Sequence, residues 1–387
     1  MPEDWLSAVA MMGRRSTECR ITVVICAYTD ARWDDTLAAV DSALAQSLPP
    51  LEVLLVIDHN PALHMRFTDR LRNTARVSVL SNSGARGLSG GRNTGVEASE
   101  GEIIAFLDDD AVAEPDWLRW FADAFADPRV MGASGLTLPV WASGRRPAWY
   151  PREFDWVHGA SYLGMPTGRA EVRNVLGGNA AFRRSAFDVA GGFRTDIGRG
   201  SEGSGRSASA GAVAGARAGP AALRRRLITS RPLGAEETEL CIRIAQQRPG
   251  SAFLFDDRAV IHHRVPTERE AMSYFCARCW AEGLSKAQVA QRVGARDGLF
   301  TERTYVTRTL PVGLARAIAD GLRGEAAGFQ RAGAIAAGVL VAAAGYAAGW
   351  VHQRRDHDHR QARERIGRIA AKTAQGPTLE RHTKSVE

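Results

Sequence analysis

Three consecutive carboxylates are the densest group of chemically capable side chains in the sequence. Asp108, Asp109 and Asp110 follow the apolar run at residues 103–107. Adjacent carboxylates repel each other, and a divalent cation among them removes the repulsion, because hard oxygen ligands suit Mg²⁺ or Mn²⁺. Acids after a strand also cap the next helix, which we expect near Pro115. We therefore expect a metal site at these aspartates, with helix capping as the alternative.

A glycine-rich stretch, residues 82–95, precedes the carboxylates and contains five glycines, two arginines and two asparagines. Glycine lets the backbone approach an anion closely, and arginine binds phosphate through a fork of N–H groups. The stretch lacks the Gly-Lys-Ser or Gly-Lys-Thr end of a Walker A loop and does not directly follow the first strand. It therefore predicts phosphate binding and argues against kinase-type ATP hydrolysis and ordinary NAD chemistry.

A second acidic group, Glu236, Glu237 and Glu239, opens a predicted helix. Carboxylates in a first turn complement the helix dipole, so capping is the default role of each one. If the fold brings this turn opposite the aspartates, one carboxylate can take a proton from an attacking hydroxyl. The pair His262–His263 follows the next strand-like run. It predicts either packing and hydrogen-bonded support, or an imidazole that completes a site begun by carboxylates.

Two other patterns are less specific. Cys276 and Cys279 form a CxxC inside a helical pattern without a second CxxC, which argues against zinc or redox chemistry. An aromatic run predicts either the floor of a sugar site or a satellite core. Its members are Trp149, Tyr150, Phe154, Trp156 and Tyr162.

The elements that must position these residues alternate between strands and helices. Apolar runs predict strands at 21–27, 51–57, 75–80 and 103–107, with helical spacing at 36–46 and 91–98. A helix from 236, a short strand at 252–255 and a helix at 272–291 follow. This order predicts an α/β fold, with a mixed, mostly parallel sheet flanked by helices and ligands at the carboxyl ends of its strands. Asp58 and Asp108 both fall at such ends.

The C-terminal part has a different composition. Residues 332–351 contain no charge, and as a helix of about 30 Å they match the hydrocarbon core of a bilayer. More than half of them are Ala or Gly, so a soluble or interfacial helix is the alternative to a membrane span. Gly345 and Gly349 have a spacing that permits close helix contact. The charged tail at 352–387 is predicted to be disordered, either solvated or at a lipid surface.

Length and composition set the domain organisation. The 387 residues carry a net charge of +7, which favours anionic ligands, and five cysteines, which fit a reducing compartment. The N-terminal extension, 1–19, shows no export signal. We expect one catalytic domain at 20–305, a mobile low-complexity insert at 200–230 and a helical linker at 306–331. The Lys and Arg residues are dispersed and no recognition module is visible, so nucleic acid is the least favoured partner.

The order of these motifs resembles family 2 glycosyltransferases of the GT-A fold over residues 20–305. VVICAYTD is similar to the family's first nucleotide-binding strand, which implies nucleotide-sugar contacts at Ala27 and Tyr28. LLVIDHN resembles the second strand, where Asp58 matches the acid that contacts the base and an isoleucine replaces its usual acidic neighbour. The Arg-Asn-x-Gly segment implies a phosphate or nucleotide role for Arg92 and Asn93.

FLDDD resembles the family's DXD motif. The resemblance implies that Asp108 and Asp110 are the two ends of the motif, that Asp110 is a direct metal ligand, and that Asp108 and Asp109 contact the nucleotide sugar. In IHHRVP, His263 matches the family's late histidine near the metal and diphosphate, with His262 as the alternative.

The acceptor side is matched by two further segments. GAEETELCIR resembles the Glu-Asp motif, which implies a catalytic role for Glu237 in the place of the aspartate base, with Glu236 beside it. GGNAAFRRSAFDVAGGF resembles the segment around the acceptor site, which implies acceptor contacts at Gly178 and Asn179.

The resemblance implies a metal-dependent, inverting transfer of a sugar from a nucleotide-diphosphate sugar to an acceptor hydroxyl, with Mg²⁺ or Mn²⁺ as cofactor. The apolar segment suggests a lipid-linked or cell-envelope acceptor and an enzyme on the cytoplasmic side of the cell membrane, with a free cytoplasmic enzyme as the alternative. Two other functions fit the same motifs: a nucleotidyltransferase, which would release pyrophosphate, and a non-catalytic nucleotide-sugar-binding membrane scaffold.

Overall fold

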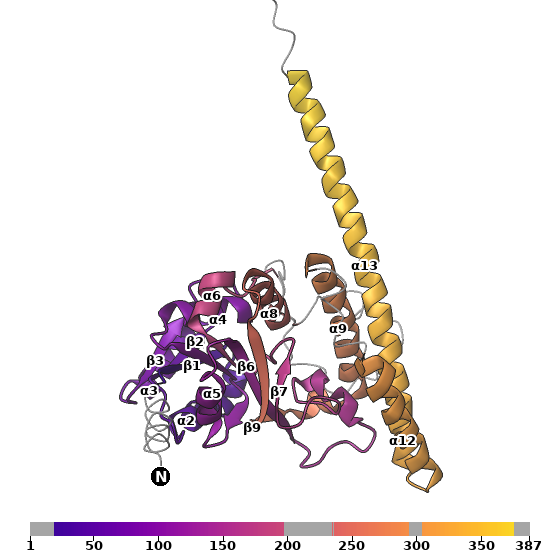
Figure 1. Ribbon diagram of the computed structural model, residues 1–387, viewed down its shortest axis with the longest axis horizontal. Helices are drawn as coiled ribbons and strands as arrows, with labels where there is room; N and C mark the ends of the chain where they lie inside the picture. Colours follow the sequence, from indigo (N-terminus) through magenta and orange to yellow (C-terminus); the bar gives the residue numbers. More distant parts are fainter. Residues whose placement is uncertain (1–18, 197–233, 235, 294–303, 375–387) are drawn as a thin grey trace, which may run out of the picture.

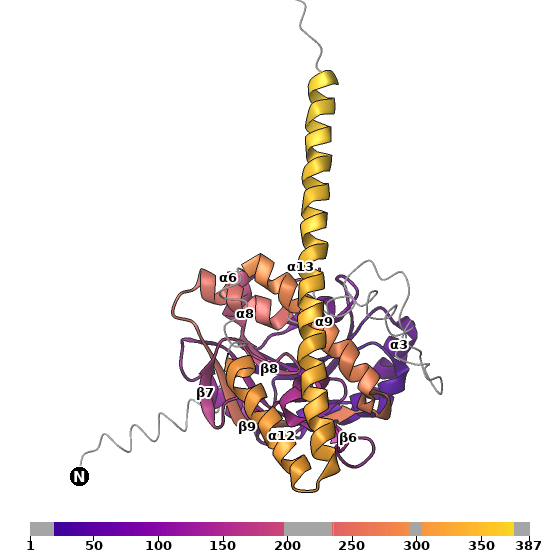
Figure 2. The ribbon, with the colours of Figure 1, turned by 90° about the vertical axis from the view of Figure 1, so that its right-hand side faces the viewer.

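The computed structural model describes residues 19–196, 234, 236–293 and 304–374 (Figure 1). The N-terminal extension up to residue 18 and the low-complexity insert predicted at 200–230 lie outside the described residues. Within them, a sheet with helices on both faces lies beside a block of long helices, and the last helix extends far past both (Figures 1 and 2).

Nine strands form a mixed sheet in the described part of the chain, with the order β3-β2-β1-β4-β8-β6-β9-β5 and with β7 paired to β9. The strands are β1 (Ile21–Ala27), β2 (Glu52–Ile57), β3 (Val77–Ser81), β4 (Ile103–Asp108), β5 (Ala111–Ala113), β6 (Val130–Trp141), β7 (Arg169–Val172), β8 (Asn179–Arg183) and β9 (Ala252–Val265). The first four strands along the chain pair in parallel, as predicted. From β8 onward the pairing is mixed, because β8 runs antiparallel to both β4 and β6.

Each face of the sheet is covered by helices because the central strands are apolar on both sides. In β1, Val23 and Ile25 belong to one buried cluster and Val24 to the other. Burying a side chain of this size stabilises the fold by about 1.5–3 kcal/mol. The first cluster lies under α2 (Trp33–Leu44), α3 (Pro61–Leu71) and α5 (Trp117–Ala124), and the second under α4 (Leu88–Ala98), α6 (Arg184–Ala190) and α8 (Glu236–Gln247).

Helix α4 lies unusually close to β1. A Cβ built on Gly95 would be 2.4 Å from Val24 Cγ1, so a larger residue would push the helix off the strand. The first turns of α4 are thereby fixed at the carboxyl edge of the parallel strands, which is where Arg92 is needed.

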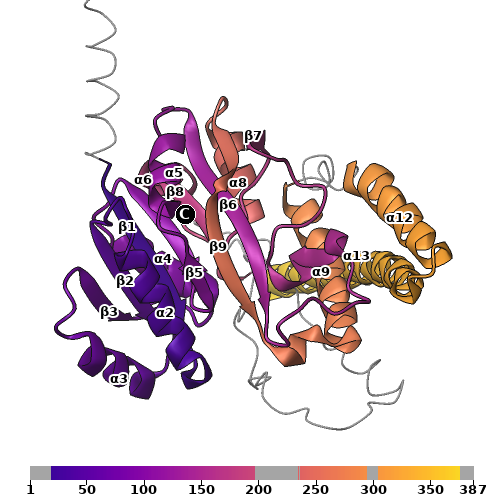
Figure 3. The ribbon, with the colours of Figure 1, turned by 90° about the horizontal axis from the view of Figure 1, so that it is seen from below.

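The aromatic run packs between the sheet and the helical block, which lie side by side in Figure 3. Tyr150 and Phe154 are each 1% exposed and pack against Phe275, so for these residues the satellite-core alternative is confirmed. Cys279 lies in the same cluster, in agreement with a packing role. The elements of this region are η2 (Arg152–His158), η3 (Thr267–Glu270), α9 (Met272–Val293), η4 (Tyr305–Thr309), α12 (Leu310–Leu322) and α13 (Ala326–Ala374), and η1 (Asp30–Arg32) precedes α2.

Glycines of α13 make the close helix contact that their spacing predicts, and the partner is α9 of the same chain. A Cβ on Gly345 would be 2.3 Å from Trp280 O, and one on Gly283 of α9 would be 2.1 Å from Ala342 O. The opposite face of α13 is exposed, with Leu340 at 70% and Phe329 at 51%.

Helix α13 differs from the sequence prediction at its C-terminal end. Its segment Ala326–Val351 is long and apolar enough to cross a membrane, in agreement with the predicted apolar helix. The helix then continues without a break to Ala374, so the charged region after His352 is helical up to that residue where a disordered tail was expected. The correction is physically reasonable because Arg and Ala, the most frequent residues of this region, are good helix formers.

Candidate active site

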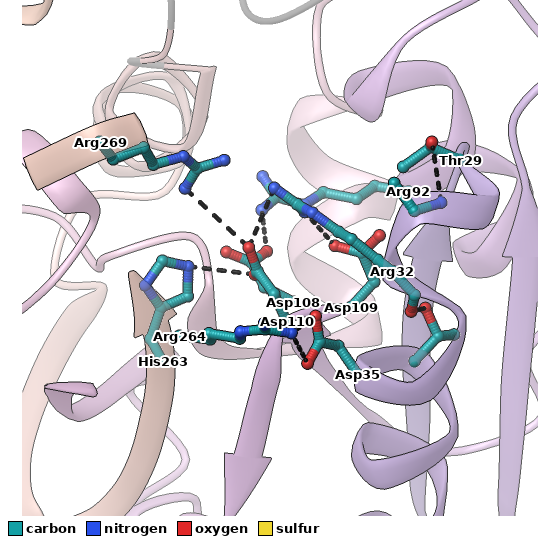
Figure 4. A network of polar contacts seen from close by, with 12 residues as sticks. Thr29, Arg32, Asp35, Arg92, Asp108, Asp109, Asp110, His263, Arg264 and Arg269 are labelled. Carbon is teal, nitrogen blue, oxygen red and sulfur yellow. Dashed lines mark hydrogen bonds and ion pairs between the residues drawn. The ribbon is translucent and has the colours of Figure 1, made fainter. Parts of the chain in front are cut away.

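The three aspartates occupy the turn between β4 and β5. Strand β4 ends at Asp108 and β5 begins at Ala111, whereas α5 begins only at Trp117. The aspartates therefore do not cap that helix, and the capping alternative is wrong here. The pairing of β5 with β9 places His263 directly opposite Ala111, so that His263 Nε2 lies 3.0 Å from Asp110 Oδ1 (Figure 4).

Asp108, Asp110 and His263 together could hold a metal ion. One ligand atom from each residue lies within 4.8 Å of the other two. Carboxylate oxygens are the protein ligands that suit Mg²⁺ and Mn²⁺, so the donor set fits such an ion. His262 faces away from this group, since its Nε2 lies 2.9 Å from Glu114 Oε1 and its side chain is 40% exposed.

Three guanidinium groups surround the aspartates (Figure 4). Arg32 of η1 donates to Asp109 Oδ1 and lies 3.0 Å from Asp110 Oδ2. Arg92 Nη2 lies 3.8 Å from Asp108 Oδ1, and Arg269 Nη1 lies 3.9 Å from Asp110 Oδ2. The site thus combines adjacent carboxylates with a set of phosphate-binding groups.

The buried aspartates differ in protonation. Burial, together with repulsion from Asp110 and Asp108, raises the pKa of Asp109 to about 7, although Arg32 partly offsets the rise. Burial acts on Asp110 in the same direction, but the attraction and hydrogen bond of His263, with help from Arg32, lower the pKa of Asp110 below its ordinary value. Asp110 is therefore ionised at neutral pH, as a metal ligand must be.

Across the sheet edge, the first turn of α8 supplies two glutamates. Glu237 Oε1 accepts a hydrogen bond of 3.0 Å from Gly177 N. Arg92 Nη2 donates to Gly177 O at 3.0 Å, and its Nη1 lies 3.5 Å from Glu236 Oε1. Burial disfavours the charged form of Arg92, but the attraction of Glu237, Glu236 and Asp108 outweighs it and raises the pKa of Arg92.

Two consecutive glycines lie between the metal-ligand candidates and the glutamates. A Cβ built on Gly177 would be 2.2 Å from Glu237 Oε1, and one on Gly178 would be 2.4 Å from Asp108 Oδ2. A larger residue at either position would displace the carboxylate that it meets, because real Cβ atoms do not approach oxygen so closely. The carboxylates of Asp108 and Glu237 therefore converge on one turn although they are far apart in sequence.

Comparison with known proteins agrees with this geometry. The model of glycosyl transferase family 2 matches residues 22–191. A glucosyl-dolichyl phosphate glucuronosyltransferase from Haloferax volcanii is 30% identical over 268 residues, which cover 69% of this chain and 76% of that protein. The chain belongs to glycosyl transferase family 2.

Two further likenesses concern a short segment of the sequence and the fold. This glycosyltransferase is 36% identical over 75 residues to UDP-Glc:alpha-D-GlcNAc-diphosphoundecaprenol beta-1,3-glucosyltransferase WfgD from Escherichia coli, covering 19% of this chain and 29% of that protein. The structure of mannosyltransferase PcManGT from Pyrobaculum calidifontis, in complex with GDP-Man and Mn²⁺, matches with a TM-score of 0.50 and 18% identity, covering 85% of this chain and 88% of the other. The likeness to the mannosyltransferase confirms the predicted GT-A fold.

The predicted nucleotide edge of the glycosyltransferase lies at the ends of β1 and β2. Asp58 accepts hydrogen bonds from Asn82 Nδ2 at 2.7 Å and from Gly87 N at 3.0 Å, so it also holds the glycine-rich loop. Ala27 is buried with its carbonyl bonded to Asp58 N, whereas Tyr28 is 52% exposed beside it. The nucleotide contacts of Tyr28 and Asp58 stay predictions.

Two predicted ligand contacts have structural roles instead. Asn179 is fully buried, accepts from Trp117 Nε1 at 2.7 Å and donates to Leu136 O and Ala259 O. Both the oxygen and the nitrogen of its side-chain amide are therefore hydrogen-bonded inside the sheet. We assign Asn179 this structural role in place of the predicted acceptor contact.

Asn93 is likewise engaged. Its side chain donates to Phe193 O at 2.9 Å and accepts from Phe193 N at 2.8 Å. It therefore ties α4 to the loop after α6. The phosphate role of Arg92 stays a prediction.

Sequence reasoning missed Arg32 and Arg269. Neither lies in a recognised motif, and each reaches the aspartates only because a turn far away in sequence comes close to β4. The available signal was indirect: three adjacent carboxylates, of which Asp109 and Asp110 are buried, require positive charge nearby.

Proposed function

We propose that this family 2 enzyme transfers a sugar from a nucleotide-diphosphate sugar to an acceptor hydroxyl, with inversion at the anomeric carbon. The observation that supports the proposal is the convergence of Asp108 and Glu237 on the adjacent glycines Gly178 and Gly177. Asp108 belongs to the groups for the leaving diphosphate, and Glu237 offers a carboxylate base. The gap between them is where a sugar ring would be held.

On the leaving-group side, Arg32, Arg92 and Arg269 present guanidinium groups to phosphate oxygens. Asp108, Asp110 and His263 would hold Mg²⁺ or Mn²⁺. When bound, the ion neutralises the charge that develops on the departing diphosphate. Tyr28 and Asp58 would line the nucleoside.

On the acceptor side, Glu237 takes the proton of the attacking hydroxyl. The N–H of Gly177 fixes Oε1, while Oε2 is buried and has no hydrogen-bond partner among the described residues. As the acceptor oxygen bonds to the anomeric carbon, the bond to the diphosphate breaks on the opposite face, and the proton moves to Glu237. Direct displacement of this kind inverts the anomeric configuration.

For the acceptor, we propose a lipid-linked molecule at the cytoplasmic face of a membrane. The name of the H. volcanii relative contains glucosyl-dolichyl phosphate, and that of the E. coli relative contains GlcNAc-diphosphoundecaprenol. Both are lipid-linked sugars. Helix α13 adds an apolar segment with exposed Phe329, Leu340 and Val351 on one charge-free face. Such a face suits insertion at a membrane interface beside the catalytic domain.

The test is a release assay with UDP-, GDP- and dTDP-sugars in Mg²⁺ or Mn²⁺, using a membrane lipid extract as acceptor. We expect release of a nucleoside diphosphate from one donor class and a glycolipid whose new bond has the opposite anomeric configuration by NMR. Pyrophosphate release would support a nucleotidyltransferase instead. Nucleotide binding without any turnover would support a scaffold.

A further inference from the structure

Arg32 occupies an oxygen that a metal ion needs. Asp110 Oδ1 faces His263 at 3.0 Å, and Asp110 Oδ2 faces Arg32 Nη2 at 3.0 Å. The same guanidinium also donates to Asp109 Oδ1, and the Arg32 side chain is only 17% exposed. Both oxygens of the predicted metal ligand are therefore engaged by groups of the protein itself (Figure 4).

Each aspartate of the cluster already has a cationic partner in the protein. Three carboxylates, Asp108–Asp110, each lie within 4.0 Å of at least one guanidinium group from Arg32, Arg92 or Arg269. Arg92 also faces Glu236. A divalent cation that entered alone at Asp110 would lie close to the Arg32 guanidinium, which contacts Asp110 Oδ2 at 3.0 Å, and like charges repel. A cation that enters together with a diphosphate adds almost no net charge.

We propose that Arg32 is a built-in competitor of the divalent cation, which holds Asp110 Oδ2 until a nucleotide diphosphate arrives with the metal. Arg32 belongs to η1, the turn directly after β1, so it sits at the edge where the nucleotide is proposed to bind. Once displaced from Asp110, its guanidinium is free to bind a phosphate oxygen. Arg32 is thus a positioning residue that makes metal binding depend on nucleotide. This inference rests on the proposed function.

The test measures Mn²⁺ binding to the full chain, from the signal of free Mn²⁺ in electron paramagnetic resonance, with and without UDP or GDP. For the wild type we expect weak binding of Mn²⁺ alone and an affinity at least about tenfold higher with one of the nucleotides. For Arg32→Gln we expect Mn²⁺ alone to bind about tenfold more tightly than to the wild type, with the nucleotide effect reduced to about threefold. Arg32→Lys, which keeps the charge without the fork, should fall between the two.

A matched control is Arg66→Gln. Arg66 belongs to α3 and pairs with Asp30 of η1, the turn that also carries Arg32. Arg66 does not contact the aspartate cluster, so this variant should bind Mn²⁺ as the wild type does. If the wild type and Arg32→Gln bind Mn²⁺ equally well, and nucleotide raises the Mn²⁺ affinity of both by the same factor, Arg32 does not compete with the metal. The proposed metal site would still stand in that case. Absence of Mn²⁺ binding to the wild type even with nucleotide overturns the proposed metal site as well, so the two failures are distinguishable.

Discussion

The carboxylates of Asp108 and Glu237 contact adjacent residues of one turn, Gly178 and Gly177. Glu237 accepts the N–H of Gly177, and Asp108 donates its own N–H to Gly178 O at 3.4 Å. Because both glycines leave no room for a Cβ, the turn fixes the distance between the two functional sides of the site. A change in this turn should act on both sides at once.

Replacement of Gly178 by alanine should reduce catalysis without unfolding the protein. The new Cβ would lie 2.4 Å from Asp108 Oδ2, so the carboxylate or the turn must move. A shift of about 1 Å near reacting groups lowers the rate by about a hundredfold, and we expect this loss in kcat/KM. Gly333→Ala is the matched control, since nothing lies within 4 Å of its Cβ position. Unchanged kcat/KM in Gly178→Ala would show that the turn does not set the geometry.

His158 should make the protein less stable in acid. It is 2% exposed, stacks on Tyr274 at 5.6 Å, and neither ring nitrogen has a hydrogen-bond partner among the described residues. Burial, reinforced by Arg269, lowers the pKa of His158 from 6.5 to about 3. Between these values the unfolded chain binds the additional proton, so stability rises with pH from about 3 to about 6.5 and is lost as the pH falls.

The effect of His158 can be isolated by His158→Phe. From pH 7.5 to pH 5.0 the wild type should lose about 2 kcal/mol of unfolding free energy through this residue. In His158→Phe, the fall in unfolding free energy between pH 7.5 and pH 5.0, measured by urea denaturation, should be about 2 kcal/mol smaller than in the wild type. An equal pH dependence in both proteins would mean that His158 can be protonated in the folded state.

The exposed face of α13 should determine membrane association. Phe329 and Leu340 are 51% and 70% exposed on a helix face without charges. The double change Phe329→Lys with Leu340→Lys should move the protein from the membrane to the soluble fraction, because charged side chains resist burial in the acyl region. Gln246→Lys, which adds a charge on the exposed side of α8, should leave the distribution unchanged. Full recovery of the wild type in the soluble fraction at high salt without detergent would contradict the proposed membrane contact.

The parallel half of the sheet was predictable from sequence because its strands are buried on both faces. Runs such as Ile21–Ala27 contain almost only apolar residues, so their pattern fits no surface strand or helix. Strands β6 and β9 were missed over most of their length. They mix Gly, Ser, Pro, His and Arg with apolar residues, and in β9 the exposed Arg264 alternates with buried His263 and Val265.

The site was predictable only where a motif marks it. Asp108, Asp110, Glu237 and His263 lie in recognisable segments, and the structure brings them to one edge of the sheet. Arg32 contacts an aspartate 77 residues away through a turn that carries no motif. The side-chain amides of Asn93 and Asn179 were misassigned because their type suits a ligand contact, whereas their partners are backbone and indole groups of the fold.

The most direct test compares Asp110→Asn with Glu237→Gln in turnover and in nucleotide affinity with Mn²⁺. For Glu237→Gln we predict a fall in kcat of about a thousandfold with nucleotide affinity within about threefold of the wild type, because only the base is lost. For Asp110→Asn we predict a large loss of kcat together with at least about tenfold weaker nucleotide binding, because a metal ligand is lost. A Glu237→Gln enzyme that retains most of the wild-type kcat would contradict the assignment of Glu237 as the base opposite the aspartate cluster.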